Sequence, residues 1–456
     1  MTEEIMPEGN GAESPAEITY VAAAVRERVV TPDLAKHSSV AIARSGFSAD
    51  QSFAYRAKFN ARAVLNAEEG FRSQDENVYF NLHWDDVHPV NLVRRAGAIL
   101  DLPRSASSDL AFLEIETQFG RMPLIDLLND PRSRIQGFVV EQGGSILFEH
   151  YPGMRENDNH LWFSVSKTLP STVLAILESQ GRLDVKRPLE FYVVEAKGTR
   201  WEGIPIIDIL DMASGLDVAE TPDTMLSPEH KVNQLFRVIH GEKIDNGKGG
   251  FWTNKDLILA MDKARPTASG TVFEYSSINT QVLVMIVEAI LGQRFSEILS
   301  DYVWSVIGAE GDALMGVTAE GEALSGGMMN SRLRDLVRYG MLFTPTGRAK
   351  FGLLAATAWG LPSMPDFAAR ISESCRPELY GEALAASEGY FAQASDADVM
   401  GNSWQWDMVY RDGDMFKGGV GGQGLYVSPD RDVSIAFFST GYNRWANVAR
   451  TIALTL

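Results

Sequence analysis

The chain has 456 residues, of which 45% are hydrophobic and 22% are charged, a composition typical of a globular protein with a large buried core. Its formal net charge of -19 argues against a nucleic-acid partner, because phosphate binding needs a basic surface. A single cysteine, Cys375, excludes an internal disulfide, and no stretch reaches the roughly 18 apolar residues of a membrane span. The acidic start Met1–Glu4 differs from a signal peptide, so we expect a cytoplasmic protein without a membrane partner.

The first quarter of the chain shows no set of residues suited to catalysis. Residues 1–16 are rich in Glu, Pro and Gly and are predicted to form a disordered tail. Residues 17–104 are predicted to form an N-terminal wrapping segment, with helical periodicity at Tyr20–Val30 and Phe59–Leu65. His83 and His88 lack a carboxylate at helical spacing, so we interpret them as packing residues and predict no metal or other cofactor. The role of residues 17–77 stays open, and contacts within a homodimer are one possibility.

Strand patterns then occur at both ends of the remaining chain. In residues 105–160 we expect helices at Asp109–Gln118 and Pro123–Asn129, and strands at Gln136–Glu141 and Ser145–Glu149 around a Gly-Gly turn. In residues 400–456 we expect four strands and a final helix: Trp404–Tyr410, Met415–Gly418, Gly424–Val427, Val433–Ser439 and Trp445–Leu456.

Residues 161–399 are predicted to be mainly helical. Amphipathic helices are expected at Asn279–Leu291, Phe295–Ile307 and Arg332–Leu342. The sequence therefore predicts an α+β (mixed α/β) fold, in which strands from both ends form one antiparallel sheet flanked by helices. A helical subdomain is inserted between those strands, and a site is expected between the two parts.

The segment Ser164-Val165-Ser166-Lys167 places a lysine three residues after a serine. A serine hydroxyl needs a base to become a nucleophile, and positions i and i+3 share one face of a helix. If Ser164 opens a helix, the positive end of the helix dipole favours an oxyanion and disfavours a protonated Lys167. The spacing is common by chance, and a helix-capping serine with a surface lysine is the alternative.

The segment Tyr275-Ser276-Ser277 offers two further polar groups. A buried Tyr275 near a cationic lysine could carry a proton to a leaving group and later activate water. Ser277 could form a hydrogen bond with the lysine or with the substrate. A loop tyrosine followed by helix-capping residues is the alternative, and it is compatible with this role.

A third segment, Lys417–Gly424, is rich in glycine and lies between two strand patterns. Glycine in a strand often marks a close approach of backbone to a ligand, so the Val420 N–H is a candidate for oxyanion binding, and Gly421, Gly422 and Gln423 for substrate binding. A glycine-rich hairpin without a ligand is the alternative. Trp162, Trp404 and Trp406 are candidates for the wall of an acyl pocket, and the last two are equally suited to the core.

Together and in this order, the three segments resemble the serine β-lactamase-like superfamily, which includes penicillin-binding proteins, class C β-lactamases and related esterases. The resemblance is greatest to the 6-aminohexanoate-dimer (nylon oligomer) hydrolases, and it is carried by His160–Lys167, Ile209–Asp217, Phe273–Leu283 and Gly422–Pro429. It implies a β-lactamase/transpeptidase-like fold without a cofactor. It also implies Ser164 as the acyl-enzyme nucleophile, Lys167 as its base and Tyr275 as the proton relay. The oxyanion hole would then be the backbone N–H groups of Ser164 and Val420.

Two departures from the family pattern narrow the expected function. Val420-Gly421-Gly422 lacks the cation and hydroxyl of the Lys-Thr-Gly motif that holds a substrate carboxylate in penicillin-binding enzymes, and the loop Val218–Asp223 lacks the tyrosine of nylon oligomer hydrolases. The sequence predicts a serine hydrolase that cleaves small carboxylic esters or linear amides. The alternatives are a β-lactamase or D-amino-acid peptidase on the same fold, and a catalytically inactive binding relative. A Ser-His-Asp hydrolase has less support, because no Gly-x-Ser-x-Gly segment is present and no histidine follows His240.

Overall fold

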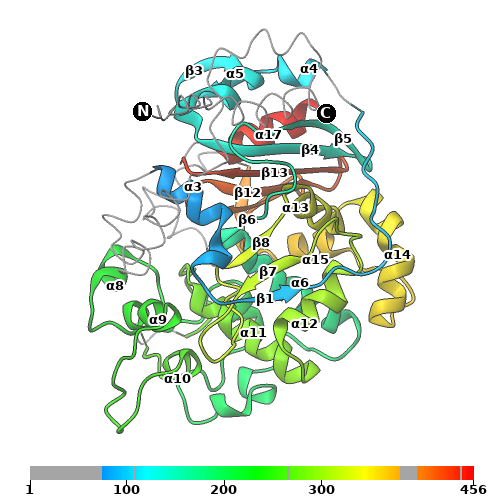
Figure 1. Ribbon diagram of the computed structural model, residues 1–456. Coiled ribbons are helices and arrows are strands. Elements are labelled where there is room, and N and C mark those ends of the chain that lie inside the picture. Colours follow the sequence, from blue (N-terminus) through cyan, green and yellow to red (C-terminus); the bar gives the residue numbers. More distant parts are fainter. Residues whose placement is uncertain (1–73, 106–107, 264–267, 380–397, 442–443) are drawn as a thin grey trace, which may run out of the picture.

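The computed structural model describes residues 74–105, 108–263, 268–379, 398–441 and 444–456. The expectations for 1–16, Tyr20–Val30 and Phe59–Leu65 lie outside these ranges. The central feature is a seven-stranded sheet in the order β5-β4-β13-β12-β11-β10-β9, with every neighbouring pair antiparallel (Figure 1). Its strands are β4 (Ile135–Gln142), β5 (Ser145–His150), β9 (Val399–Ser403), β10 (Trp406–Tyr410), β11 (Met415–Gly419), β12 (Gln423–Ser428) and β13 (Val433–Ser439).

Alternating side chains give this sheet two buried faces. In β13, Val433, Ile435 and Phe437 belong to one hydrophobic cluster, whereas Ala436 and Phe438 belong to the other. The first cluster is covered by α5 (Leu124–Asn129) and the C-terminal helix α17 (Trp445–Thr455), as Figure 1 shows. The second face packs against α13 (Leu333–Gly340) of the inserted part. The sheet therefore lies between two helical layers.

The inserted part occupies the chain between β5 and β9. Its other helices are α6 (Thr168–Ser179), α7 (Ile206–Leu210), α8 (Pro222–Leu226), α9 (Lys231–Ile239), α10 (Asn254–Leu259), α11 (Ser277–Leu291), α12 (Phe295–Leu299), α14 (Pro345–Trp359) and α15 (Phe367–Ser374). A second sheet has the order β1-β7-β8-β6 and consists of β1 (Val90–Val93), β6 (His160–Leu161), β7 (Ala313–Gly316) and β8 (Met329–Ser331). Because β1 pairs with β7, it fastens the segment that begins with α3 (Gln74–Leu82) to the inserted part.

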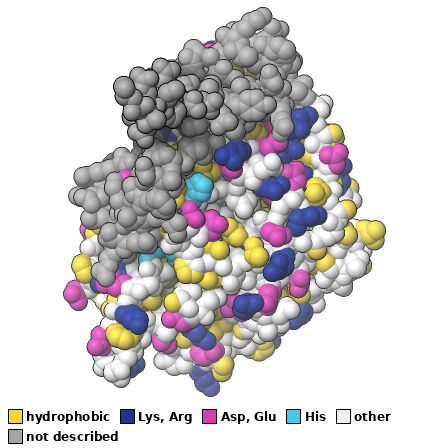
Figure 2. All heavy atoms as spheres, viewed as in Figure 1, with side chains coloured by type: hydrophobic (Ala, Val, Ile, Leu, Met, Phe, Trp, Pro, Cys, Tyr) yellow, Lys and Arg dark blue, Asp and Glu magenta, His cyan; other side chains and the backbone are white. Residues whose placement is uncertain are grey.

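The predicted fold class, an antiparallel sheet flanked by helices with an inserted helical part, is confirmed. The boundaries of the predicted parts, at 105–160, 161–399 and 400–456, stay predictions. Within the described ranges, no helix is long and apolar enough to cross a membrane. On the face shown in Figure 2, Lys and Arg side chains of the described residues are interspersed with those of Asp and Glu.

Two predicted elements are wrong. The helix expected at Asp109–Gln118 is a short helix, α4 (Ser108–Ala111), followed by a hairpin of β2 (Glu114–Thr117) and β3 (Gly120–Pro123). Gly120 has a φ of +102°, and Thr117 Oγ1 accepts a hydrogen bond from Phe119 N–H, so local turn chemistry overrides the helical pattern. The strand expected at Trp404–Tyr410 begins two residues later, because Trp404 and Gln405 form a turn with φ angles of +49° and +71°.

The expected helix at Phe295–Ile307 changes its geometry along its length. The α-helical part, α12, ends at Leu299, and Ser300–Trp304 continue as a π-helical turn.

A buried carboxylate fastens the edge strand β5 to the helix that covers it. Glu149 in β5 accepts hydrogen bonds from Arg334 in α13 at 2.6 and 2.9 Å and from the Tyr151 hydroxyl at 3.0 Å, and it pairs with Arg104 of the N-terminal segment. Burial pulls the pKa of Glu149 upward, but the hydrogen bonds and charges of Arg334 and Arg104 hold it below its usual value. Removal of Glu149 would leave the Arg334 charge and the Tyr151 hydroxyl without this partner.

We therefore expect Glu149→Ala to lower the free energy of unfolding, measured by urea denaturation, by about 3 kcal/mol. The matched control is Glu195→Ala, which removes an exposed ion pair with Lys255 and should cost less than about 1 kcal/mol. Equal losses in the two variants would contradict a structural role for the Glu149 pair.

Candidate active site

The first site segment is a sharp change of direction between β6 and a helix. After β6, Phe163 has a φ of +47°, a strained conformation for a residue other than glycine, and Phe163–Lys167 form a 3-10 turn that leads into α6. Ser164 lies in the first turn of this helical segment, where backbone N–H groups lack partners within the helix. This turn therefore places Ser164 directly after β6, at the start of the helical segment.

Hydrogen bonds from the inserted part hold this turn. The Ser166 hydroxyl accepts Met329 N–H at 3.1 Å, and the Ser325 hydroxyl donates to the Ser166 carbonyl at 3.0 Å. Pro170, the third residue of α6, has no N–H group to bond the Ser166 carbonyl in the α-helical pattern. Ser325 supplies the missing donor, so the proline is accommodated and α6 continues to Ser179.

Lys167 is buried and surrounded by oxygen atoms. Its Nζ lies 3.0 Å from Ser164 Oγ and 2.8 Å from Ser277 Oγ, and it also donates to the Gly326 carbonyl. Burial is the largest cause that lowers the pKa of Lys167, to about 8, and the nearby charge of Lys417 lowers it further, whereas Glu220 and Asp407 act in the opposite direction. This amine can lose its proton near neutral pH and accept one from Ser164.

The second segment reaches the site at the start of α11. The Ser276 hydroxyl caps α11 by accepting Ile278 N–H at 3.0 Å, and Ser277 is thereby directed toward Lys167. The Glu220 carboxylate accepts Ser277 N–H, and Glu220 N–H donates to the Tyr275 carbonyl at 3.0 Å. The ring of Tyr275 lies between two amines, with its centroid 5.2 Å from Lys167 Nζ and 4.9 Å from Lys417 Nζ.

The third segment approaches the nucleophile turn along β11. A Cβ atom at Gly419 would lie 2.7 Å from the Trp162 carbonyl oxygen, so only glycine permits this approach. Val420, Gly421 and Gly422 form the turn between β11 and β12, in which Gly422 N–H donates to the Gly419 carbonyl at 3.0 Å. The backbone of Val420 is thus held beside the segment that carries Ser164.

The expectation that this strand lacks a cation is wrong. It compared Lys-Thr-Gly with Val420-Gly421-Gly422, but those residues form the turn, and the strand itself carries Lys417-Gly418-Gly419. Lys417 is fully buried and paired with Asp407 of β10 at 2.5 Å, and the same carboxylate accepts Gly418 N–H at 3.0 Å. Burial lowers the pKa of Lys417, and Asp407 acts against that change.

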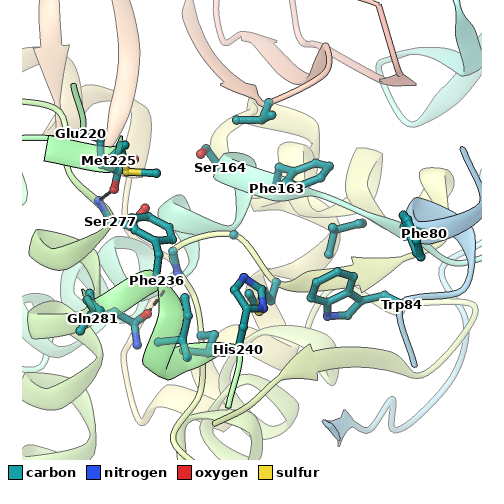
Figure 3. Close-up of a pocket in the computed structure, with 18 of the residues that line it drawn as sticks. Phe80, Trp84, Phe163, Ser164, Glu220, Met225, Phe236, His240, Ser277 and Gln281 are labelled. Atoms are coloured by element: carbon teal, nitrogen blue, oxygen red, sulfur yellow. Dashed lines mark hydrogen bonds between the residues drawn. The ribbon is translucent and has the colours of Figure 1, made fainter. Parts of the chain in front are cut away.

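A cavity of about 290 Å³ opens at Ser164 (Figure 3). Ser164, Ser277, Val420 and Glu220 line its catalytic end. Aromatic and aliphatic side chains form most of the remaining wall, and these are Phe80, Trp84, Leu161, Phe163, Met225, Leu226, Leu235, Phe236, Ile239, Leu324 and Met328. Among the described residues, no group of three His, Cys, Asp or Glu side chains is placed to hold a metal ion.

Several predicted substrate-binding residues lie elsewhere. Trp162 is buried, its indole N–H donates to Ser331 Oγ at 2.9 Å, and it packs against Trp304 and Tyr339, so it belongs to the core. The left-handed conformation of Phe163 directs that neighbouring ring into the cavity instead.

The other predicted substrate-binding residues of the third segment, and the two remaining tryptophans, also lie outside the cavity lining. Gln423 is buried and donates to the Ser439 carbonyl at 3.0 Å, whereas Gly421 and Gly422 shape the turn without lining the cavity. Trp404 and Trp406 are core residues.

The sequence interpretation missed Glu220, Gly326, Asp407 and the cavity residue Trp84. Glu220 lies in the loop Val218–Asp223, whose acidic character is a local signal for a carboxylate near the site. The other three reach the site through tertiary packing, for which the local pattern holds no signal.

Sequence comparison relates the chain to a known family. The Beta-lactamase family profile matches residues 133–455. A 6-aminohexanoate-dimer hydrolase of Paenarthrobacter ureafaciens is 29% identical over 309 residues, which cover 66% of this chain and 72% of that protein.

Two solved structures share the fold. A Bacillus anthracis protein assigned as a 6-aminohexanoate-dimer hydrolase superimposes with a TM-score of 0.62 at 21% identity, covering 83% of this chain and 92% of its own. EstCE1, a hydrolase with promiscuous acyltransferase activity, gives a TM-score of 0.52 at 14% identity, covering 71% and 94%.

The geometry predicts that Ser164 is the most reactive hydroxyl of the protein. A fluorophosphonate probe should label Ser164 in the intact chain, as located by peptide mass spectrometry, and Lys167→Met should slow labelling because the proton acceptor is lost. Ser179→Ala is the matched control, since its hydroxyl donates to Ala175 on α6. Labelling that persists in Ser164→Ala at the same rate would contradict the assignment.

Proposed function

The chain belongs to the Beta-lactamase family and is a hydrolase of that fold, and we propose that it cleaves small carboxylic esters or linear amides through an acyl-enzyme on Ser164. The observation that carries this proposal is the 3.0 Å distance from Lys167 Nζ to Ser164 Oγ in a buried setting. The curated relative is named for hydrolysis of a 6-aminohexanoate dimer, which supports a linear amide as one substrate class.

The proposed reaction begins when Lys167 accepts the Ser164 proton and Ser164 Oγ attacks the substrate carbonyl carbon. The backbone N–H groups of Ser164 and Val420 bind the oxyanion that forms. Tyr275 then gives a proton to the departing alcohol or amine and is reprotonated from Lys167, which leaves an acyl group on Ser164. In the second half of the reaction, a water molecule gives a proton to Tyr275 and Lys167 and attacks the acyl carbon. The carboxylic acid product then departs as Ser164 recovers its proton.

The geometry gives less support to β-lactamase or D-amino-acid peptidase activity. Such substrates carry a carboxylate, and Lys417, the cation on β11, is already paired with Asp407. An inactive binding relative is also less supported, because the hydroxyl and the amine lie at reactive distance. A cytoplasmic location, a small-molecule partner and a homodimer stay predictions.

A turnover panel tests this function directly. We expect the enzyme to hydrolyse p-nitrophenyl butyrate and the matched p-nitroanilide faster than a chromogenic cephalosporin. Ser164→Ala should lower kcat on the order of 10⁴-fold, and Lys167→Ala nearly as much, because the two groups act together. Tyr275→Phe should affect the anilide more than the activated ester, whose leaving group needs less protonation.

The Ser179→Ala variant is the control for this panel. An acyl adduct on Ser164, trapped by acid quench and seen by mass spectrometry, should accompany turnover of the wild type. Turnover by Ser164→Ala at the rate of the control would exclude the proposed mechanism.

The lowered pKa of Lys167 predicts a pH dependence. Because only the neutral amine can accept the Ser164 proton, kcat/KM should be low when Lys167 is protonated, rise with pH through a midpoint near its pKa of about 8, and level off above it. Asp407→Asn should move this midpoint downward, since the Asp407 charge raises the pKa of Lys167. A rise whose midpoint is near pH 10 would contradict the proposal that burial prepares this amine.

A further inference from the structure

The wall of the cavity opposite the inserted part comes from outside the range that the family profile matches. Phe80 in α3 and Trp84 after it line the cavity, whereas the matched range begins at residue 133. Figure 3 shows both rings on the side of the cavity away from Phe236 and Ser277, with His240 next to Trp84. The N-terminal segment therefore closes a space that the matched part leaves open.

The described lining is mainly apolar, with amide side chains at Asn77, Asn81, Asn233, Asn254 and Gln281, and it lacks a free cation. No Lys or Arg is among the lining residues of the described chain, and the acidic ones are Glu76 and Glu220. The two lysines beside the cavity are engaged, Lys167 with Ser164 and Ser277, and Lys417 with Asp407. Among the described residues, a substrate carboxylate would find no unpaired cation to replace its lost hydration, which is unfavourable.

Trp84 is held in place by several contacts. Its carbonyl accepts N–H groups of Val87 and His88 at 3.1 and 3.0 Å, and its ring stacks on the His88 ring with centroids 4.9 Å apart. The nitrogens of His88 face the carbonyls of Pro89 and Ile239 at 3.0 and 3.3 Å, and Ile239 ends α9 on the adjoining wall.

The indole nitrogen of Trp84 also has a close neighbour in β7. A Cβ atom at Gly316 of β7 would lie 3.2 Å from Trp84 Nε1, so a glycine there leaves room for the indole. The ring is 5% exposed and forms a fixed end to the cavity.

We propose that this cavity binds a neutral, apolar acyl group of the substrate and that Trp84 sets the greatest chain length it accepts. The proposal rests on the function proposed above and names the substrate class for the same site. A volume of about 290 Å³ is at the small end for small-molecule sites, so one large ring at its wall takes up space that a longer chain would need.

The chain-length profile of the full-length enzyme tests the role of Trp84. With p-nitrophenyl esters from acetate to dodecanoate, Trp84→Ala should move the maximum of kcat/KM to acyl chains at least two carbons longer. It should raise kcat/KM for the longest esters about 10-fold or more, since one methylene group in an apolar pocket is worth roughly that factor. The gain should be smallest for acetate, whose two-carbon acyl group fills the least of the cavity.

Phe191→Ala is the matched control, because that aromatic ring is exposed and remote from the cavity lining. Trp84→Phe should give a smaller shift in the same direction, and it replaces Trp84→Ala if the latter loses acetate hydrolysis through misfolding. A maximum at the same chain length in wild type and Trp84→Phe, with no gain for long esters, would overturn the role of Trp84.

A second arm tests the charge of the acyl group. The p-nitrophenyl monoester of adipic acid matches the hexanoate ester in chain length but ends in a carboxylate, and we expect its kcat/KM to be about 100-fold lower. Equal kcat/KM values would overturn the proposal for a neutral acyl group. If instead the wild type turns over no ester and Ser164 takes up no acyl group, the proposed function itself fails, and the two failures are thus distinguishable.

Discussion

The structure depends on keeping the amine of Lys167 buried beside Ser164. An ammonium group that is removed from water must be surrounded by acceptors or lose its proton. Its acceptors here come from three separate stretches of chain: Ser164 on the nucleophile turn, Ser277 at the start of α11 and the Gly326 carbonyl before β8. The sheet, the inserted helices and the small second sheet must therefore all be in place before this amine has its partners. Catalysis and folding of the inserted part are coupled through one side chain.

The charged groups around the Lys167 amine have opposite effects on its pKa. The positive charge of Lys417 lowers the pKa of Lys167, whereas the negative charges of Glu220 and Asp407 raise it. Asp407 also pairs directly with Lys417, which keeps a second buried charge neutralised and places it against the Tyr275 ring. The Tyr275 ring faces both amines, so the charge of either amine acts on this ring. The pair on β10 and β11 thus supports the proposed chemistry without touching the substrate.

Local spacing was enough to find Ser164, Lys167, Tyr275 and Val420 as candidates, and strand patterns at both ends of the chain were enough to predict the antiparallel sheet. The predictions were wrong where the backbone angles of a few residues determine which side chains line the cavity and where a strand begins. A positive φ angle at Phe163 brings this ring to the cavity, and positive φ angles at Trp404 and Gln405 form the turn before β10; no periodicity reports them. The register of β11, which puts Lys417 rather than Val420 on the strand, follows from pairing with β12. Contacts of Glu220 with Ser277 and of Trp84 with Gly316 join segments far apart in sequence, so a single sequence gives no measure of them.

The site is therefore built from two parts of the chain. Its reacting groups lie within the part that matches the Beta-lactamase family, on elements fixed by the two sheets. Its apolar end depends on a segment before that part, attached by β1 pairing with β7 and by the His88 contact to Ile239. Changes in this segment can reshape the cavity without moving Ser164 or Lys167, because neither the nucleophile turn nor α11 is built from it. Similarity in the matched part then bears on the proposed reaction, whereas the proposed choice of acyl group depends on the segment that carries Phe80 and Trp84.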